Sequence, residues 1–374
     1  MKKLFTLLAI SMFIFSCTKK ANENEILIGS YSSNTGATAT FGVYQLRGTE
    51  MAINEINAAG GINGKKIKHI NYDNKSDANE TLAVVNRLIS QDKVVAILGE
   101  ATSGRSKIGA QVAQQHKIPM LSSSATNPDV TKVGNYIFRA CFIDPFQGMV
   151  MAKFMTENLK LKKAAILRDI KNDYSVGLSD IFAEKLKAAG GEIITDISYQ
   201  EGDIDFKSQL TAIKAKNVEA IFVPGYYNEV ALIAKQAKEL GMTMPLLGGD
   251  GWSSPKLYEI AKEAINGNYF SNHYTTESKD PKTVNFVKAF KAKFNEDADV
   301  MAALAYDAVY LMAEAIKNSK EVTSENIRIE LSKIKDFHGV TGQMSMDENR
   351  NAVKSAVVVQ VQGTEYKFIT SVTP

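Results

Sequence analysis

The sequence predicts an α/β protein with two doubly wound lobes, each built on a parallel sheet. Short apolar runs alternate with helical patterns along most of the chain, and such alternation indicates parallel strands covered by helices on both faces of a sheet. The alternation breaks off near residues 139–146 and then begins again, which favours two lobes over one large sheet. A chain of 374 residues, 45% of them hydrophobic, has the size and composition for two such cores.

The first half of the chain is expected to contain four strands separated by three helices. The predicted strands are residues 26–28, 67–72, 94–98 and 119–121. The predicted helices are residues 42–59, a segment around 82–89, and residues 107–116. Two of the strands stop at a glycine, Gly29 and Gly99, as buried parallel strands often do. The first helix ends at the pair Gly60 and Gly61, a typical C-terminal stop.

The second half repeats this pattern and then changes. Strands are expected at residues 164–167, 192–197, 220–223 and 244–247. Helices are expected at 179–189, between 197 and 220, and at 230–240, where Val230, Ile233, Ala234 and Ala237 follow helical spacing. After Asp280 the sequence predicts three helices, at 281–294, 300–318 and 324–333, and two β-rich stretches, at 353–361 and 366–372.

The charge balance argues against a nucleic-acid-binding protein. Lys and Arg total 44 and Asp and Glu total 41, which gives a net charge of +3. A nearly neutral chain lacks the concentrated basic face that nucleic acid requires. Two cysteines supply neither a disulfide framework nor a four-ligand zinc site, and the four histidines are dispersed without a known catalytic motif. We therefore expect no metal, no cofactor and no enzymatic activity, and we expect Cys141 to be buried.

The first twenty residues have the pattern of an export signal. Two lysines precede an apolar run over residues 4–15, which is too short to span a bilayer and fits a secretory signal peptide. The run ends at Ser16 and Cys17, which resembles the lipobox of bacterial lipoproteins. We expect residues 1–16 to be the lipoprotein signal peptide, Cys17 to carry the lipid and residues 17–24 to be a tether. A plain signal peptide that happens to contain Cys17, or a buried helix at the start of the chain, is the alternative. In the first case the protein is exported and lipid-anchored to the bacterial cell envelope, facing the periplasm or the outer surface.

Hydroxyl-rich segments follow two neighbouring strands of the first predicted lobe. Residues 100–104 follow the strand over 94–98, and residues 122–128 follow the strand over 119–121. Ligands of open parallel sheets bind beyond the carboxyl ends of the strands, where helix N-termini also present backbone N–H groups. Both features suit a carboxylate, although Ser and Thr at these places could simply cap helices.

The corresponding ends of the second lobe carry tyrosines and a carboxylate. These residues are Tyr174, Tyr226, Tyr227 and Asp250. An ammonium group and an apolar side chain would need groups of this kind. One lobe thus offers donors to an anion and the other offers acceptors to a cation. The ligand that suits both is a zwitterion.

Residues 53–67 (INEINAAGGINGKKI) resemble the signature of the periplasmic leucine/isoleucine/valine-binding proteins of branched-chain amino-acid ABC importers. Further matches to that family are residues 124–128, Phe138 with Arg139, Asp144 with Gln147 and Gly148, and residues 225–227. The resemblance implies a periplasmic-binding-protein type I fold and a monomer. It also implies an extracytoplasmic substrate-binding lipoprotein that binds a branched-chain or other hydrophobic amino acid and presents it to the membrane permease of an ABC transporter.

The resemblance also assigns the ligand-binding residues. In the first lobe, Phe41 covers the side chain of the ligand. Ser103, Thr126 and either Ser124 or Ala125 bind its α-carboxylate and amine. In the second lobe, Tyr174, Asp250 and either Tyr226 or Tyr227 close on the amine. Asp250 stands where leucine-type receptors carry Glu, and Phe41 where they can carry Trp, so the side-chain preference is left open.

The lobes are expected to be discontinuous in sequence. The first comprises residues 25–143 and 274–344, and the second comprises residues 144–273 and 345–374, with a three-segment hinge near 142–145, 273–275 and 342–346. Two other functions have some support in the sequence. Residues 99–106 are one residue from a phosphate-binding loop, but Arg105 replaces its lysine. A receptor that reports an amino acid, or a related small acid or amide, to a membrane partner has the same fold and remains the alternative.

Overall fold

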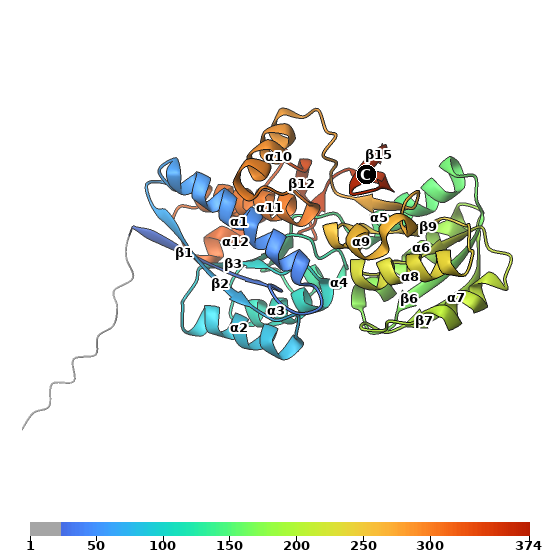
Figure 1. The fold of residues 1–374 in the computed structure, drawn as a ribbon. Coiled ribbons are helices and arrows are strands. Elements are labelled where there is room, and N and C mark those ends of the chain that lie inside the picture. Colours follow the sequence, from blue (N-terminus) through green and yellow to red (C-terminus); the bar gives the residue numbers. More distant parts are fainter. Residues whose placement is uncertain (1–23) are drawn as a thin grey trace, which may run out of the picture.

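The computed structural model describes residues 24–374, so the predicted signal peptide and Cys17 lie outside the described residues. Two lobes stand side by side, each a sheet with helices on both faces (Figure 1). Within this described part, no helix is both long enough and apolar enough to cross a membrane. The predicted architecture of two doubly wound lobes is confirmed.

The first lobe is built on a five-stranded sheet with the order β2-β1-β3-β4-β5. All of its neighbouring strands are parallel. The strands are β1 (Glu25–Ser32), β2 (Lys66–Asp73), β3 (Ala96–Gly99), β4 (Met120–Ser122) and β5 (Ile137–Arg139). The sequence did not predict β5, because three residues that end in a charged arginine show no strand periodicity.

Helices cover both faces of this sheet. They are α1 (Ala39–Ala58), α2 (Ala78–Ser90), α3 (Ser103–Gln115), α4 (Asp129–Lys132), α10 (Pro281–Phe294), α11 (Val300–Asn318) and α12 (Ser324–Lys333). Residues of α1, α11 and α12 share one apolar core, and residues of α2 and α3 share the core on the other face. Helices α1 and α11 pack closely because Gly48 has no side chain: a Cβ there would lie 2.1 Å from the carbonyl oxygen of Ala302.

The second lobe is built on a seven-stranded sheet with the order β15-β14-β10-β9-β8-β6-β7. Its strands are β6 (Lys163–Asp169), β7 (Glu192–Tyr199), β8 (Ala220–Phe222), β9 (Leu246–Gly248), β10 (Tyr269–Asn272), β14 (Ala356–Gln362) and β15 (Glu365–Val372). Its helices are α5 (Asp144–Lys153), which continues as the π-turn Phe154–Asn158, α6 (Asp173–Ala188), α7 (Lys207–Lys214), α8 (Tyr227–Glu239) and α9 (Pro255–Ala261). Two short 3₁₀ turns, Asp250–Trp252 and Lys262–Ala264, flank α9.

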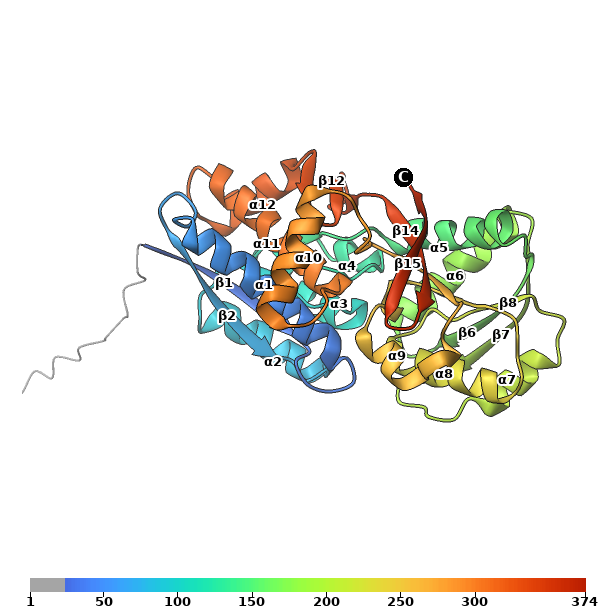
Figure 2. The same cartoon turned by 45° about the horizontal axis from the view of Figure 1, so that its top comes forward.

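The second sheet is mixed rather than purely parallel. Strands β14 and β15 form a hairpin that pairs antiparallel to β10. Figures 1 and 2 show this hairpin, in dark red, on the side of the second lobe that is next to the first lobe. The parallel core predicted from the alternating pattern is therefore present, with two antiparallel strands added at one edge.

The last passage of the chain between the lobes lies later than predicted. Strands β11 (Phe337–Gly339), β12 (Gly342–Met346) and β13 (Ala352–Val353) form a small sheet of their own. Met344, Met346 and Ala352 pack into the apolar core of the first lobe. The chain therefore reaches the second sheet between β13 and β14, rather than at the predicted residues 342–346, because these apolar side chains remain in the first core.

Two helices at the carboxyl ends of the strands begin earlier than the sequence predicted. Helix α3 starts at Ser103 instead of residue 107, and α6 starts at Asp173 instead of residue 179. The first turn of α3 buries Ser103 and Ser106, which have no apolar periodicity to reveal a helix. Helix α6 begins where the Asn172 side chain accepts a hydrogen bond from the Tyr174 N–H. Both early starts move residues of the predicted site into helix first turns.

Candidate functional site

The carboxyl ends of the two sheets face each other across a narrow cavity. Its lining residues come from both lobes: Phe41, Ala101, Ser103, Ser124, Thr126 and Met301 from the first, and Tyr174, Tyr226, Asp250 and Gly251 from the second. The space that no atom fills there is about 220 Å³, part of it open to solvent. Seven of the nine residues predicted to bind ligand therefore lie around one cavity.

The wall from the first lobe is made of hydroxyl groups at helix and strand ends. Ser103 is the first residue of α3, and its Oγ accepts a hydrogen bond from the Asn127 N–H at 3.2 Å. The preceding residue, Thr102, caps this helix without a side-chain hydrogen bond to it. Ser124 donates from Oγ to the carbonyl of Ala101 at 3.3 Å. This wall presents neutral hydroxyls and a positive helix end, which together suit a carboxylate.

The wall from the second lobe is made of two stacked tyrosines beside a carboxylate. The rings of Tyr174 and Tyr226 lie 5.4 Å apart and nearly parallel. The hydroxyl oxygen of Tyr174 accepts a hydrogen bond from the Gly251 N–H at 3.2 Å, so its proton is free to be donated. Burial raises the pKa of both tyrosines above the usual value, so both hydroxyls keep their protons at neutral pH.

Asp250 is buried, with 3% of its surface exposed, and opens the short turn after β9. Its Oδ1 accepts a hydrogen bond from Nε2 of Gln147 at 3.1 Å, and its Oδ2 lies 3.0 Å from Nε2 of His273. Each carboxylate oxygen can accept two hydrogen bonds. These contacts therefore leave acceptor capacity on both oxygens for a cation in the cavity.

Phe41 lies where the two walls meet. Its ring packs edge-on against Tyr226 and Tyr227, with centroid distances of 5.6 and 4.9 Å. Phe41, Ala101 and Met301 make the first-lobe side of the cavity apolar.

Two of the predicted site residues lie away from the cavity lining. Tyr227 instead joins the lobes: its hydroxyl donates to the carbonyl of Ala37 and accepts from the N–H of Thr40, both at 3.3 Å. The Ala125 side chain packs in the first-lobe core, and its N–H donates to Oγ of Ser122. For Ala125 the cause is the turn after β4, which points its methyl group inward while Ser124 and Thr126 face the cavity.

Three lining residues were missed by sequence reasoning. Ala101 lies two residues before Ser103 and Gly251 directly follows Asp250, but a methyl group and a residue without a side chain carry no chemical signal. Met301 stands near the start of α11, after the chain has returned to the first lobe, and no strand end marks its position.

Other contacts between the lobes hold the cleft closed. Lys107 of α3 forms an ion pair with Asp173 of α6, and Nδ2 of Asn127 donates to the Asp173 carbonyl at 2.8 Å. Asn228 adds a hydrogen bond from Nδ2 to the Ala37 carbonyl at 2.6 Å. The structure therefore represents the closed arrangement of the two lobes.

Two residues outside the cavity, Arg105 and Cys141, were also singled out in the sequence. Arg105, in the segment that resembles a phosphate-binding loop, contacts Oε1 of buried Glu100 at 3.2 Å and donates to Oγ1 of Thr38 at 2.5 Å. These contacts direct the guanidinium to the lobe's own side chains. Cys141 is buried as predicted, and burial raises the pKa of its thiol to about 12.

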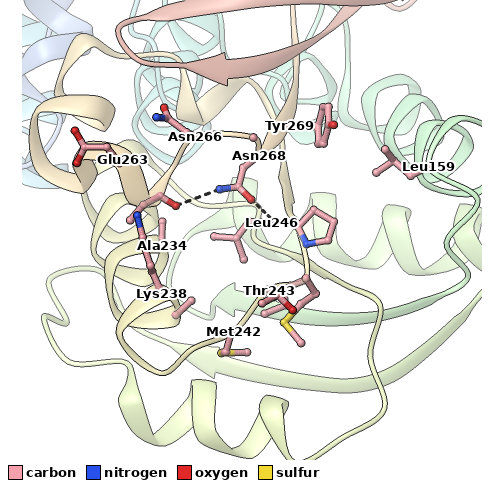
Figure 3. Close-up of a pocket in the computed structure, with 16 residues that line it drawn as sticks. Leu159, Ala234, Lys238, Met242, Thr243, Leu246, Glu263, Asn266, Asn268 and Tyr269 are labelled. Carbon is pink, nitrogen blue, oxygen red and sulfur yellow. Dashed lines mark hydrogen bonds between the residues drawn. The ribbon is translucent and has the colours of Figure 1, made fainter.

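A larger cavity lies at the opposite, amino edge of the second sheet (Figure 3). It is lined mainly by residues that precede β9 and β10, such as Met244 and Asn268. The Asn268 amide already accepts from the N–H of Leu246 at 2.7 Å and donates to the carbonyl of Ile265 at 2.9 Å. The cavity between the lobes is smaller, but it brings together polar groups of opposite character from both lobes, so it is the candidate site.

Comparison with known proteins gives consistent matches over nearly the whole chain. The family model described as periplasmic binding protein matches residues 25–365. A leucine-, isoleucine-, valine-, threonine- and alanine-binding protein of Pseudomonas aeruginosa is 30% identical over 349 residues, covering 93% of this chain and 92% of the relative.

Two solved structures are similar in both sequence and fold. The leucine-binding protein LivK of Thermotoga maritima has a TM-score of 0.90 and 35% identity, covering 93% of this chain and 99% of its own. The branched-chain amino acid transporter substrate-binding protein LivJ of Streptococcus pneumoniae, in complex with isoleucine, has a TM-score of 0.89 and 38% identity. That match covers 94% of this chain and all of the LivJ chain.

Proposed function

Because the chain belongs to the periplasmic binding protein family, we propose that it is the substrate-binding protein of an ABC importer and closes on a hydrophobic amino acid. It is a binding protein and not an enzyme. The observation that carries the proposal is the cavity between the lobes, where hydroxyl groups of one lobe face the Asp250 carboxylate of the other. An amino acid carries both a carboxylate and an ammonium group, so it offers one charged group to each wall.

The polar ends of the ligand are assigned by charge. Ser103 and Thr126 would bind the α-carboxylate, together with N–H groups at the start of α3. Ser124 would join them by turning its proton from the Ala101 carbonyl to the ligand. Asp250 would bind the ammonium, because a buried cation requires a charged partner. The hydroxyl of Tyr174 would complete the second-lobe side, since its oxygen accepts from the Gly251 N–H, which leaves its proton for a ligand.

The side chain of the ligand is assigned by the apolar part of the cavity. Phe41, Ala101 and Met301 would surround it without offering a charge or a strong hydrogen-bond partner. Burying a branched aliphatic side chain there contributes about 1.5–3 kcal/mol. The same surface would reject an acidic or basic side chain, which could not be solvated. This favours leucine, isoleucine, valine or a similar residue.

The direct experiment is a calorimetric titration of the mature protein with each of the twenty amino acids. We expect the branched-chain amino acids to bind most tightly and charged ones not to bind. Saturating ligand should also reduce the radius of gyration in solution scattering, because a ligand contacted by both lobes shifts the population toward the closed state. Absence of binding by every hydrophobic amino acid would refute the proposal. Loss of uptake of the bound amino acid in a deletion strain would distinguish transport from sensing.

We also propose that Cys17 carries a lipid that anchors the exported protein to the cell envelope. The support is the leader sequence, in which an apolar run ends at Ser16 and Cys17. Cys17→Ser should release an otherwise normal protein from the membrane fraction. The several acyl chains of a lipoprotein hold it firmly in the membrane, and the variant would carry none of them. Unchanged membrane fractionation of the variant would contradict the anchor.

A further inference from the structure

We propose that Gln147 and His273 are positioning residues that fix the Asp250 carboxylate for the ligand's ammonium group and couple its orientation to the hinge. This inference rests on the proposed function, because it concerns how the amino acid is held. Neither residue lines the cavity. Both contact Asp250 from outside the cavity: His273 lies on a segment that connects the two lobes, and Gln147 lies close after another such segment.

Gln147 uses its whole hydrogen-bonding capacity to hold this region. Its Nε2 donates to Oδ1 of Asp250 at 3.1 Å and to Oδ1 of Asp144 at 2.7 Å. Its Oε1 accepts from the Ser271 hydroxyl at 3.0 Å and from the Asp250 N–H at 3.4 Å. The amide therefore contacts both the side chain and the backbone of Asp250. Such a fully satisfied buried amide has one orientation and cannot rotate without losing several bonds.

His273 fixes the second oxygen of the same carboxylate. Its Nε2 lies 3.0 Å from Oδ2 of Asp250, and the ring is buried. Burial lowers the pKa of His273, although Asp250 acts in the opposite direction, so the ring is neutral at pH 7. Among residues 24–374, none forms a hydrogen bond with its Nδ1. The proton therefore belongs on Nε2, because a buried Nδ1–H would be left unsatisfied and a bare Nε2 would repel the carboxylate oxygen.

The two contacts leave the charge of Asp250 unneutralised. Gln147 and His273 are both neutral donors, so they orient the carboxylate without cancelling its negative charge. An ammonium group that enters the cavity then becomes the charged partner of a carboxylate that is already in place. Such preorganisation raises affinity because no side-chain freedom is lost when the ligand binds.

The positions of the two residues connect this carboxylate to the hinge. His273 directly follows β10, where the chain leaves the second sheet, and Gln147 lies in the first turns of α5, just after the chain enters that lobe. The ring of His273 also stacks on Phe142, with centroids 3.6 Å apart, and Phe142 lies in the first crossing segment. Two crossing segments thus meet at the group that orients Asp250. A change in the hinge should therefore change how Asp250 meets the ligand.

The test is a double-mutant cycle measured by calorimetry with the best-binding amino acid. His273→Phe keeps an aromatic ring stacked on Phe142 but removes the hydrogen-bond donor to Asp250. We expect the affinity for the amino acid to fall about ten- to hundredfold, as for the loss of a hydrogen bond to a charged group. His273→Gln can present an N–H near the Nε2 position and should recover most of the loss. In the Asp250→Asn background, His273→Phe should change affinity less than threefold, because His273 acts through Asp250.

One control and a second variant make the outcome decisive. His338→Phe removes a comparable but exposed pair, in which Nε2 lies 2.6 Å from Oδ2 of Asp280, and should leave affinity unchanged. Gln147→Met, measured in the same two backgrounds, provides a second cycle in case His273→Phe does not fold. Full additivity of either folded variant with Asp250→Asn would overturn the inference while leaving the proposed function intact. A parent protein that binds no amino acid would instead refute the proposed function itself.

Discussion

The two walls of the cleft carry different chemistry, although each stands at the carboxyl edge of a parallel sheet. The first-lobe wall offers the hydroxyls of Ser103, Ser124 and Thr126 and contains no charged side chain in the cavity lining. The second-lobe wall contains Asp250, and buried side chains behind it hold that carboxylate in place. One wall is neutral and held by local turns, whereas the other is charged and held by a network that reaches the hinge.

This difference explains why closure should depend on the ligand. In an open cleft water solvates Asp250, but in the closed cleft only 3% of its surface is exposed. Burying a carboxylate without a counter-charge is costly, whereas burying neutral hydroxyls costs less. A ligand with an ammonium group offsets that cost and shifts the population toward closure. The asymmetry predicts that changes in the second wall have larger effects than changes in the first.

Asp250→Asn tests the charged wall and should have the largest effect. The substitution keeps the size of the side chain but leaves the ligand's ammonium without a charged partner. Breaking a buried pair of this kind costs about 3–5 kcal/mol, or roughly two to four decades in affinity. Calorimetric titration of the purified variant with the best amino acid measures the loss.

The matched control is Asp180→Asn, which removes a second-lobe carboxylate that is 64% exposed and paired with Arg168. It should bind like the parent. If Asp250→Asn melts like the parent and binds within threefold of it, the ammonium is held elsewhere.

Ser103→Ala tests the neutral wall and should have a smaller effect. The substitution removes one neutral donor to the ligand's carboxylate, which costs about 1.5–3 kcal/mol in binding. Ser106→Ala is the matched control, because Ser106 lies one turn further along α3, is equally buried and donates to the Glu100 carbonyl instead of facing the cavity. Equal losses of affinity for the two serine variants would show that Ser103 acts only through the fold.

Much of the fold follows from the sequence, because apolar periodicity dominates where an element is long. Helices α10, α11 and α12 begin and end at the predicted residues. The short strand β5 and the antiparallel pairing of β14 with β10 were not predicted. The residues of a strand do not by themselves specify its length or the strand with which it pairs. The early start of α3 was missed because small polar residues can be buried in a helix without any apolar pattern.

The cavity lining was predictable in part for a similar reason. Polar residues after strands identify a site, and they brought Ser103, Tyr174 and Asp250 together as expected. Met301 could not be found in this way, because an apolar residue in a buried helix has the same pattern whether it faces a ligand or the core. The role of Gln147 depends on contacts 103 residues apart, which no local pattern contains.

The pH dependence of stability tests whether Asp144 and Asp250, two buried carboxyl groups of the second lobe, influence each other's charge. Burial and the nearby Asp250 raise the pKa of Asp144 from 3.8 to about 7, against the opposing effects of Gln147, Thr126 and Arg139. The folded chain therefore holds a proton that the unfolded chain releases near pH 4. This contribution to stability is complete below about pH 4 and is lost as the pH rises to 7.

Asp144→Asn should remove that part of the pH dependence. We expect the unfolding free energy of the parent to fall between pH 4 and pH 7 by about 3–4 kcal/mol more than that of the variant. Denaturant unfolding at several pH values measures the difference. Parallel pH profiles for the two proteins would show that Asp144 is charged throughout this range in the folded state.

The smallest effect is expected where the two lobes touch outside the cavity. The side chains of Lys107 and Asp173 form an ion pair between the lobes, but they are 34% and 43% exposed, respectively. Exposed pairs contribute about 0–1 kcal/mol and weaken in salt. Lys107→Ala should therefore lower affinity by less than about fivefold at 0.15 M salt, and the difference from the parent should shrink further at 1 M salt. Calorimetry at both salt concentrations measures this. If the loss instead approaches that of Asp250→Asn, exposed contacts between the lobes hold the cleft closed rather than the buried carboxylate. The contrast between the two walls then does not control binding.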